Sequence, residues 1–107
     1  MTRRVEWAEA ALTDLRAQIA YIAHDNPDAA ARVAKAIRKT GEDLGAFATG
    51  HPGRVNNTYE KSVRGLPYIM AYALTDGDSA VSILRVIHSA RDWPDEAWPD
   101  HEVAGNR

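Results

Sequence analysis

The 107-residue sequence predicts a single α+β domain, in which an N-terminal strand and an antiparallel two-helix hairpin pack on a small antiparallel β-sheet. Three observations predict this class. Apolar residues recur at helical spacing over residues 8–44, three strand-like segments follow from residue 54 onward, and short turns join those segments. A helical hairpin lying on one face of such a sheet buries the apolar surface of both layers.

The first half of the sequence predicts one strand and two helices. Residues 3–7 fit a short strand with Val5 and Trp7 on one face. The helix that follows reaches residues 24–25, and its apolar stripe comprises Ala8, Leu12, Leu15, Ile19 and Ile22. Asn26 and Pro27 separate it from a second helix, because asparagine caps a helix and proline is tolerated in its first turn. The second apolar stripe comprises Ala30, Val33, Ala34, Ile37 and Leu44.

The second half predicts a loop and three strands. The loop covers residues 45–54, where glycine and small residues dominate, and the strands cover residues 54–63, 66–74 and 80–88. The middle strand is almost wholly apolar, which is typical of a central strand covered on both faces, so we expect Tyr68 and Tyr72 in the core. Because the N-terminal strand cannot bury its apolar face alone, we expect it beside a later strand.

Composition limits the class of protein. Hydrophobic residues make up 45% of the sequence and charged residues 26%, as in soluble globular domains. The absence of cysteine excludes disulfides, thiolate catalysis and cysteine-ligated zinc. No apolar segment approaches the roughly 20 residues that a membrane span needs, and the N-terminus lacks the apolar stretch of a signal peptide. We therefore expect a cytoplasmic protein without a membrane partner.

The charges are unevenly distributed along the chain, whose formal net charge is −2. Residues 1–91 contain 12 basic and 10 acidic residues, whereas the last 16 residues contain five acidic residues and one basic residue. This balance excludes the strongly basic surface of a free-standing DNA-binding domain. We expect a folded domain over residues 1–94 and an acidic, partly disordered tail over residues 95–107.

Over residues 4–94 the chain resembles the RelE/ParE family of type II toxin–antitoxin toxins. The order and spacing of five segments carry the resemblance: VEWAEAALTDL, YIAHDNPDAAARV, HPGRVNNTYE, RGLPYIMAYAL and ILRVIHSARDWP. The resemblance implies a small cytoplasmic toxin that a cognate antitoxin holds inactive by wrapping its surface. Operator DNA would then be contacted only indirectly, through the antitoxin.

The family divides by target, and the resemblance leaves both branches open. One branch cleaves messenger RNA in the ribosome, while the ParE-like branch is associated with poisoning DNA gyrase and lacks the nuclease residues. HPGRVNNTYE and RVIHSARDWP are more similar to the ParE-like branch, and HSARDWP lacks the tyrosine found in some nuclease members. We expect a gyrase inhibitor that acts by binding. A ribosome-dependent endoribonuclease is the alternative, and a non-toxic relic bound by its antitoxin is the third possibility.

Residues for nuclease chemistry are present but not clearly assembled. Metal-free RNA cleavage needs a base, a cation beside the phosphate and an acid. The predicted sheet and its end offer Arg54, Glu60, Lys61, Arg85, His88 and Arg91. If the protein is a nuclease, we expect the catalytic groups among Arg85, His88, Arg54 and Glu60. No catalytic residue is assigned firmly.

Arg85 interrupts an otherwise apolar strand and has two interpretations. Strict alternation puts Val81, Ile83, Arg85 and Ile87 on one face and Ser82, Leu84, Val86 and His88 on the other. Arg85 and His88 then point apart, unless the strand bulges or ends between them. Arg85 equally fits a structural arginine paired with an acid such as Glu60.

Other residues are candidates for binding a protein partner. Tryptophan flanked by charge often anchors an interface, and the candidates are Arg54, Arg64, Arg91, Trp93 and Trp98. The second predicted helix has a basic flank, formed by Arg32, Lys35, Arg38 and Lys39. This flank is either solvated or faces an acidic partner. The histidines lack metal-ligand spacing and no nucleotide-binding motif is present, so we expect no metal and no cofactor.

Overall fold

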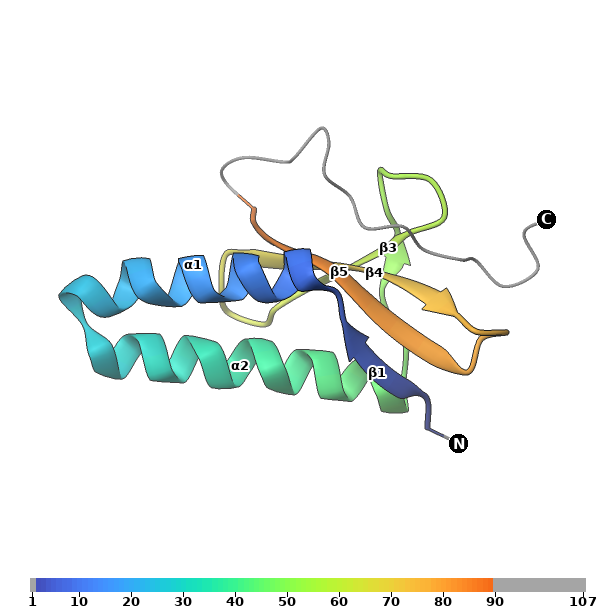
Figure 1. Cartoon of the computed structure of the whole chain (residues 1–107), viewed down its shortest axis with the longest axis horizontal. Helices are drawn as coiled ribbons and strands as arrows, with labels where there is room; N and C mark the ends of the chain where they lie inside the picture. The colour runs from blue at the N-terminus through green and yellow to red at the C-terminus, as the bar shows by residue number, and fades with distance from the viewer. Residues whose placement is uncertain (1, 90–107) are drawn as a thin grey trace.

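The computed structural model describes residues 2–89, which form two helices and five strands. In chain order these are β1 (Arg4–Trp7), α1 (Glu9–Asp25), α2 (Pro27–Ala46), β2 (His51–Pro52), β3 (Tyr59–Ser62), β4 (Tyr68–Thr75) and β5 (Ala80–His88). The helices lie side by side as an antiparallel hairpin against the sheet (Figure 1). The predicted two-helix hairpin on a small sheet is therefore confirmed, and the short strand β2 is an addition.

The strands form one sheet in the order β1-β5-β4-β3-β2. Neighbouring strands run antiparallel except β1, which pairs in parallel with residues 80–83 of β5. The N-terminal strand thus joins a later strand, as predicted, and makes the sheet mixed. The chain passes directly from β1 into α1, where the Ala8 N–H donates to the Ile83 carbonyl over 2.9 Å. This bond fixes the start of α1 beside β5.

Asn26 separates the two helices as the sequence predicts. Its N–H donates to the Ile22 carbonyl (2.9 Å) at the end of α1, and its Oδ1 accepts from the Ala29 N–H (3.0 Å) at the start of α2. One residue therefore satisfies both helix ends. The hairpin turn that it forms lies at the far left of Figure 1, away from the strands.

Helix α2 continues through Ala46, past the predicted loop start at Gly45, so that prediction was wrong by two residues. Glycine at this position allows close packing and does not end the helix. A Cβ on Gly41 would lie 2.7 Å from Trp7 Cζ2, and one on Gly45 would lie 2.7 Å from Val5 Cγ2. The two glycines allow β1 to lie directly against the helix, which buries part of Val5 and Trp7.

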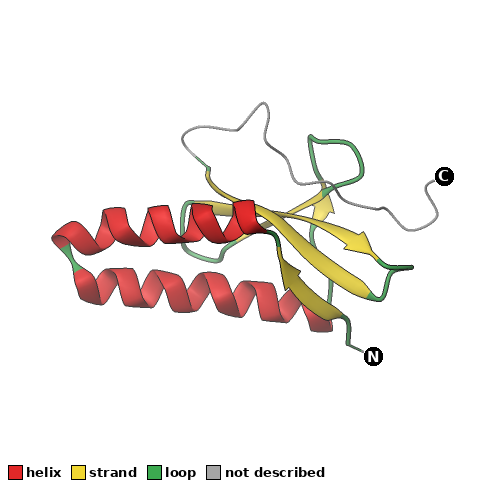
Figure 2. Cartoon of the chain, viewed as in Figure 1, coloured by secondary structure: helices red, strands yellow, loops and turns green. Residues whose placement is uncertain are grey.

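The predicted strand over residues 54–63 was wrong in its first half, because β3 begins only at Tyr59. Residues 54–58 form a turn, in which Asn57 has a φ of 63° and the Thr58 hydroxyl donates to the Val55 carbonyl over 2.6 Å. These local bonds satisfy backbone groups that a strand would otherwise pair. Figure 2 draws this turn, with Arg54 in it, as a loop that projects from the sheet.

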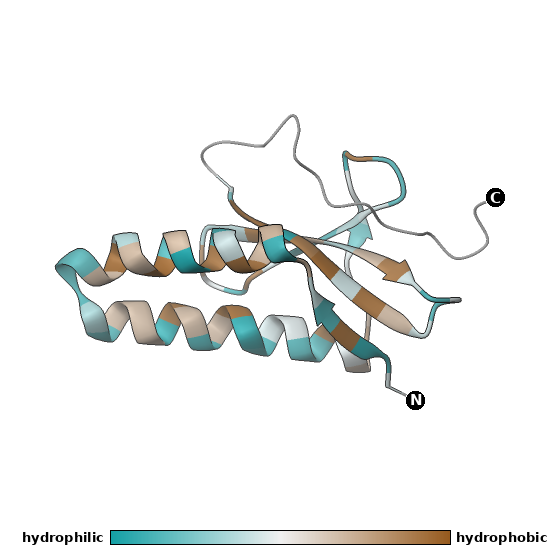
Figure 3. Cartoon of the chain, in the orientation of Figure 1, coloured by the Kyte–Doolittle hydropathy of each residue, from teal (hydrophilic) through white to brown (hydrophobic). Residues whose placement is uncertain are grey.

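The core lies between the helices and one face of β4 and β5. It includes Tyr68 and Tyr72, as predicted, and its other buried members are Ala11, Ile37, Leu44, Val63, Met70, Val81, Ile83 and Val86. Hydrophobic residues mark β5 in Figure 3 and alternate with polar ones along the helices. Across residues 2–89, neither helix is long and apolar enough to cross a bilayer.

A bulge in β5 alters the predicted faces. Ala71 of β4 pairs with Arg85, but the next residue, Tyr72, pairs with Ile83, so that Leu84 is an extra residue. The predicted grouping of Arg85 with Val81 and Ile83 was therefore wrong. Val86 joins these two residues in the core instead, and Arg85 points to the opposite side.

Candidate functional site

Arg85 is held by an acid of helix α1. Its Nε donates to Asp14 Oδ2 over 2.7 Å and its Nη2 donates to Asp14 Oδ1 over 2.8 Å, and both side chains are mostly buried. The same carboxylate accepts the Val86 N–H over 2.9 Å, beyond the last residue of β5 that β1 reaches. Hydrogen bonding to Asp14 raises the pKa of the Arg85 guanidinium above its usual range. Arg85 is thus a mostly buried arginine paired with an acid, as one of its two interpretations requires, but that acid is Asp14 and not Glu60.

Glu60 instead organises the turn before β3. Its side chain is only 6% exposed, and its Oε2 accepts the Arg54 N–H over 2.9 Å and lies 3.5 Å from Arg54 Nε. A Cβ on Gly53 would lie 3.2 Å from this carboxylate, so the turn closes tightly over it. Glu60 therefore fixes the backbone from which the exposed Arg54 side chain projects.

His88 ends β5 at a distance from these groups. Its ring meets the ring of Tyr68 edge to face, with centroids 5.4 Å apart. Pairing is regular from Arg85 to His88, so the two side chains lie on opposite faces of the strand, as predicted. The contact between His88 and Tyr68 is therefore an aromatic packing contact.

The four candidates for nuclease chemistry are thus divided among three places. Arg85 binds Asp14, Glu60 and Arg54 form the turn before β3, and His88 packs on Tyr68. A metal-free cleavage site requires such groups around one phosphate. Residues 2–89 also contain no cluster of three or more His, Asp or Glu side chains fit to hold a metal ion.

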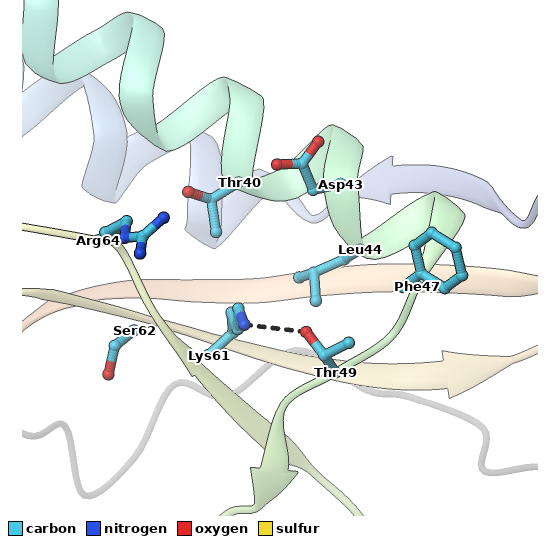
Figure 4. A pocket seen from close by; sticks show the side chains of 8 residues that line it. All are labelled: Thr40, Asp43, Leu44, Phe47, Thr49, Lys61, Ser62 and Arg64. Carbon is cyan, nitrogen blue, oxygen red and sulfur yellow. Dashed lines mark hydrogen bonds between the residues drawn. The ribbon is translucent and has the colours of Figure 1, made fainter.

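A hollow lies between α2 and β3, with a volume of about 510 Å³. Its lining comprises Thr40, Asp43, Leu44, Phe47, Thr49, Lys61, Ser62 and Arg64. Figure 4 shows Arg64 and Phe47 at opposite ends, with Lys61 between them. Lys61 Nζ donates to the Thr49 hydroxyl over 2.9 Å, and the Phe47 side chain is 74% exposed. An aromatic side chain so exposed at the rim of a hollow suits a binding surface.

A second, mostly apolar hollow of about 430 Å³ adjoins the first at Arg64, which lines both. Its other lining residues are Ala29, Arg32, Val33, Ala36 and Leu66. We call the two hollows together the α2–β3 groove. One wall is the side of α2, and the other is β3 with the turn that follows it.

The groove includes some partner candidates from the sequence and not others. Arg64 and Arg32 line it, whereas Arg54 lies in the turn beyond β2. Arg91, Trp93 and Trp98 lie outside the described residues. Sequence reasoning missed Phe47 and Leu66, because one falls in the expected loop and the other in the expected central strand. A large apolar residue within a glycine-rich segment was the available signal for Phe47.

Comparison with known proteins gives two matches in sequence. The family model described as the ParE toxin of the type II toxin–antitoxin system parDE matches residues 5–93. Putative toxin Y4kP of Sinorhizobium fredii (strain NBRC 101917 / NGR234) is 39% identical over 93 residues, which are 86% of this chain and 94% of that protein.

Two solved structures share the fold. A chain of the chromosomal ParDE TA system from P. aeruginosa matches with a TM-score of 0.74 and 19% identity, over 81% of this chain and 96% of that one. A chain of the toxin–antitoxin complex RelBE2 from Mycobacterium tuberculosis matches with a TM-score of 0.57 and 26% identity, over 82% of this chain and 99% of that one.

Proposed function

The chain belongs to the ParE toxin family of type II toxin–antitoxin systems, and on that premise we propose that it inhibits DNA gyrase by binding, without cleaving nucleic acid itself. A cognate antitoxin neutralises it, and its place of action is the cytoplasm, where gyrase works. The similarity to chains of the ParDE and RelBE2 systems supports an antitoxin partner. In this proposal the toxin contacts operator DNA only indirectly, through the antitoxin.

One observation carries the choice of binding over cleavage: Nε and Nη2 of the Arg85 guanidinium both donate hydrogen bonds to the Asp14 carboxylate. To turn these two N–H groups toward a phosphate in the transition state, the arginine would have to leave a mostly buried carboxylate, which would then lack its cation. His88 lies on the other face of the same strand. A toxin that only binds its target needs none of these groups near one another.

A supercoiling assay tests the proposal. Purified chain, freed from its antitoxin, is added to gyrase, ATP and relaxed plasmid. We expect loss of supercoiling that the antitoxin encoded beside the toxin gene reverses. The variant His88→Ala should inhibit as strongly as the natural sequence, because His88 serves packing. Full supercoiling activity at a large excess of toxin would contradict the proposal.

The similarity to the RelBE2 chain, at 26% identity, supports a second candidate, ribosome-dependent cleavage of messenger RNA. Toe-printing on translating ribosomes separates the two candidates. Codon-dependent cleavage by the natural sequence that disappears in His88→Ala would establish the nuclease and reject the gyrase proposal. Absence of both activities, with the antitoxin still bound, would identify a relic that has lost its toxicity.

A further inference from the structure

We propose that the chain folds back after β5 and covers the face of the sheet opposite the helices, with the Trp93 side chain over Ala71. This surface, which we call the second face, consists of Ile69, Ala71 and Ala73 of β4 and Ile87 of β5. Trp93 lies outside the described residues, and the buried surface of β4 and β5 points to its place. Such a cover would form whatever the toxin's target is.

Alternation along β4 defines the second face. Residues 68, 70 and 72 belong to the core cluster, so residues 69, 71 and 73 point away from the helices. Ile87 pairs with Ile69 and shares its side of the sheet. Ala71 has Glu60 and Arg85 as its strand neighbours, so these two side chains border the second face.

The second face is buried, although it does not belong to the core. Ala71 and Ala73 are 0% exposed, and Ile87 is 3% exposed. Leu84, the extra residue of the bulge, is also 0% exposed and lies outside the core cluster. Apolar residues on an uncovered sheet face would remain in contact with water. This burial is that of a single chain, so the cover comes from within the chain itself.

The described helices and the turn before β3 do not account for this cover. Both helices pack on the other face, against the core cluster. The turn at residues 54–58 is held by Glu60 of β3, two strands away from Leu84 and Ile87 of β5. The segment after Ser89, which continues directly from β5, is therefore assigned this role.

The segment after β5 starts beside the second face and can reach it. The Ser89 N–H donates to the Pro67 carbonyl over 2.8 Å, which places the end of β5 next to the start of β4. Ala71 lies four residues beyond Pro67, about 13 Å along a strand. The four residues after Ser89 cover about the same distance when extended. Trp93 is the only large apolar side chain among residues 90–94, so it is the first that can cover Ala71.

The second face also suits an indole in shape. Alanine at its centre leaves space above the sheet that a large ring can fill. The ion pairs Arg54–Glu60 and Arg85–Asp14 border this space. Guanidinium groups interact favourably with the face of an indole, so a tryptophan between these two pairs would be stabilised from its sides as well as from below.

Charge favours the same arrangement. Residues 90–107 include five acidic and two basic residues, whereas residues 44–75, which contain β3 and β4, include one acidic and three basic residues. Opposite charge therefore draws the segment toward these strands. A covered second face would also keep an RNA strand away from Glu60 and Arg85, as expected of a toxin that binds without cleaving.

NMR spectroscopy of the unaltered full chain tests the contact. With alanine methyl groups and tryptophan rings labelled, we expect nuclear Overhauser effects between the Ala71 methyl group and the Trp93 ring, and an upfield ring-current shift of that methyl signal. Both should persist on dilution. Their absence from the folded chain would overturn the proposal. Their loss on dilution would show that a second copy supplies the ring, and would overturn it as well.

Cysteine labelling provides a second test, because the natural sequence contains no cysteine. Ala71→Cys should react with a maleimide at least about 100-fold more slowly than the exposed Lys35→Cys, and Trp93→Ala should speed its reaction at least about tenfold. Trp98→Ala is the matched control and should change the rate by less than about twofold. Unchanged protection of Ala71→Cys in the Trp93→Ala background would reject the cover.

Ala11→Cys separates loss of a local cover from loosening of the whole domain. Ala11 is 0% exposed on the core face, so Trp93→Ala should leave its labelling unchanged. Equal acceleration at both cysteines would show a global effect and contradict the proposal. A chain ending at residue 94 should protect Ala71→Cys as the full chain does, whereas a chain ending at residue 89 should not. Protection that appears only with added antitoxin would assign the second face to the antitoxin instead, and the proposal would fail.

Discussion

Asp14 joins helix α1 to the sheet through three hydrogen bonds, two from Arg85 and one from the Val86 N–H. The carboxylate accepts a strand N–H of β5 beyond the point where β1 ends, and it binds Arg85, the residue that follows the bulge at Leu84. Asp14 thus accepts a hydrogen bond from the backbone of an irregular strand and also neutralises a mostly buried cation. The sequence shows a charged residue in an apolar strand, but not that its partner lies 71 positions earlier.

The first prediction concerns this carboxylate. Asp14→Ala leaves a mostly buried arginine and a strand N–H without an acceptor, so we expect a loss of about 2–4 kcal/mol in the free energy of unfolding. Urea unfolding followed by circular dichroism measures it. Glu9→Ala removes a carboxylate of an exposed ion pair on the same helix and should change stability by less than about 0.5 kcal/mol. Equal effects of the two substitutions would contradict the buried role of Asp14.

Tyr72 supports a prediction about alkaline pH. Burial raises the pKa of its phenol above the usual value of 10.0, although the Gly50 N–H, which donates to the phenol oxygen, opposes the shift. The folded state therefore holds this proton more tightly than the unfolded chain. Its contribution is fully present below about pH 10 and is lost as the pH rises through the folded pKa.

Tyr72→Phe should remove the part of the alkaline loss of stability that comes from this phenol. At pH 7 it should lower the free energy of unfolding by about 1–2 kcal/mol, because the Gly50 N–H loses its acceptor. Urea unfolding at pH 7, 9, 10 and 11 measures both effects. Tyr21→Phe is the control, since Tyr21 is 70% exposed. A decline above pH 10 that is as steep in Tyr72→Phe as in the natural sequence would count against burial as its cause.

Among the elements, the helices were easier to predict than the strands. Asn26 and Pro27 mark the helix boundary through chemistry that acts locally, so both helices were placed within two residues of their observed ends. The turn at residues 54–58 depends on side-chain bonds from Thr58 and Glu60 that alternation does not encode, and the strand residues after the bulge at Leu84 bind Asp14 from the distant helix α1. Alternation alone therefore extended one strand too far and assigned the wrong face in another.

The close contact of β1 and α2 yields a prediction at the scale of elements. Gly45→Ala would gain up to about 1 kcal/mol of helix propensity, but its Cβ would lie 2.7 Å from Val5 Cγ2 and 2.9 Å from the Arg3 carbonyl oxygen. We expect a net loss of about 1–3 kcal/mol. Thermal unfolding measures it, with exposed Lys35→Ala on the same helix as the control. Net stabilisation by Gly45→Ala would show that β1 can move away.

For the whole molecule, the sequence identified the family but located little of the groove. The sequence predicts a partner contact for Arg64 and offers Lys61 only for catalysis, and it contains no pattern that assigns a role to Phe47. These residues come from the turn after β3, from β3 itself and from the end of α2. Only the packing of the helix beside the edge of the sheet brings them together, and no local pattern encodes that proximity.

The domain boundary gives a prediction for the whole chain. The described core cluster lies between Ala11 and Val86, and the family model ends at residue 93. A chain ending at residue 94 should keep its helical circular dichroism and a cooperative thermal transition, with stability within about 1 kcal/mol of the full chain. A broad, non-cooperative transition in the shortened chain would place residues 95–107 within the folded unit.

The link from Asp14 to β5 also bears on resistance to degradation. Only Ala11 is fully buried among the side chains of α1, so apolar contact alone would hold this helix weakly. Detachment of α1 from the sheet would break the Arg85–Asp14 ion pair and also remove the acceptor of the Val86 N–H. A partly unfolded form in which only α1 is detached is therefore disfavoured. Proteases that require a melted segment should therefore cut within this helix less readily while the Asp14 link is intact.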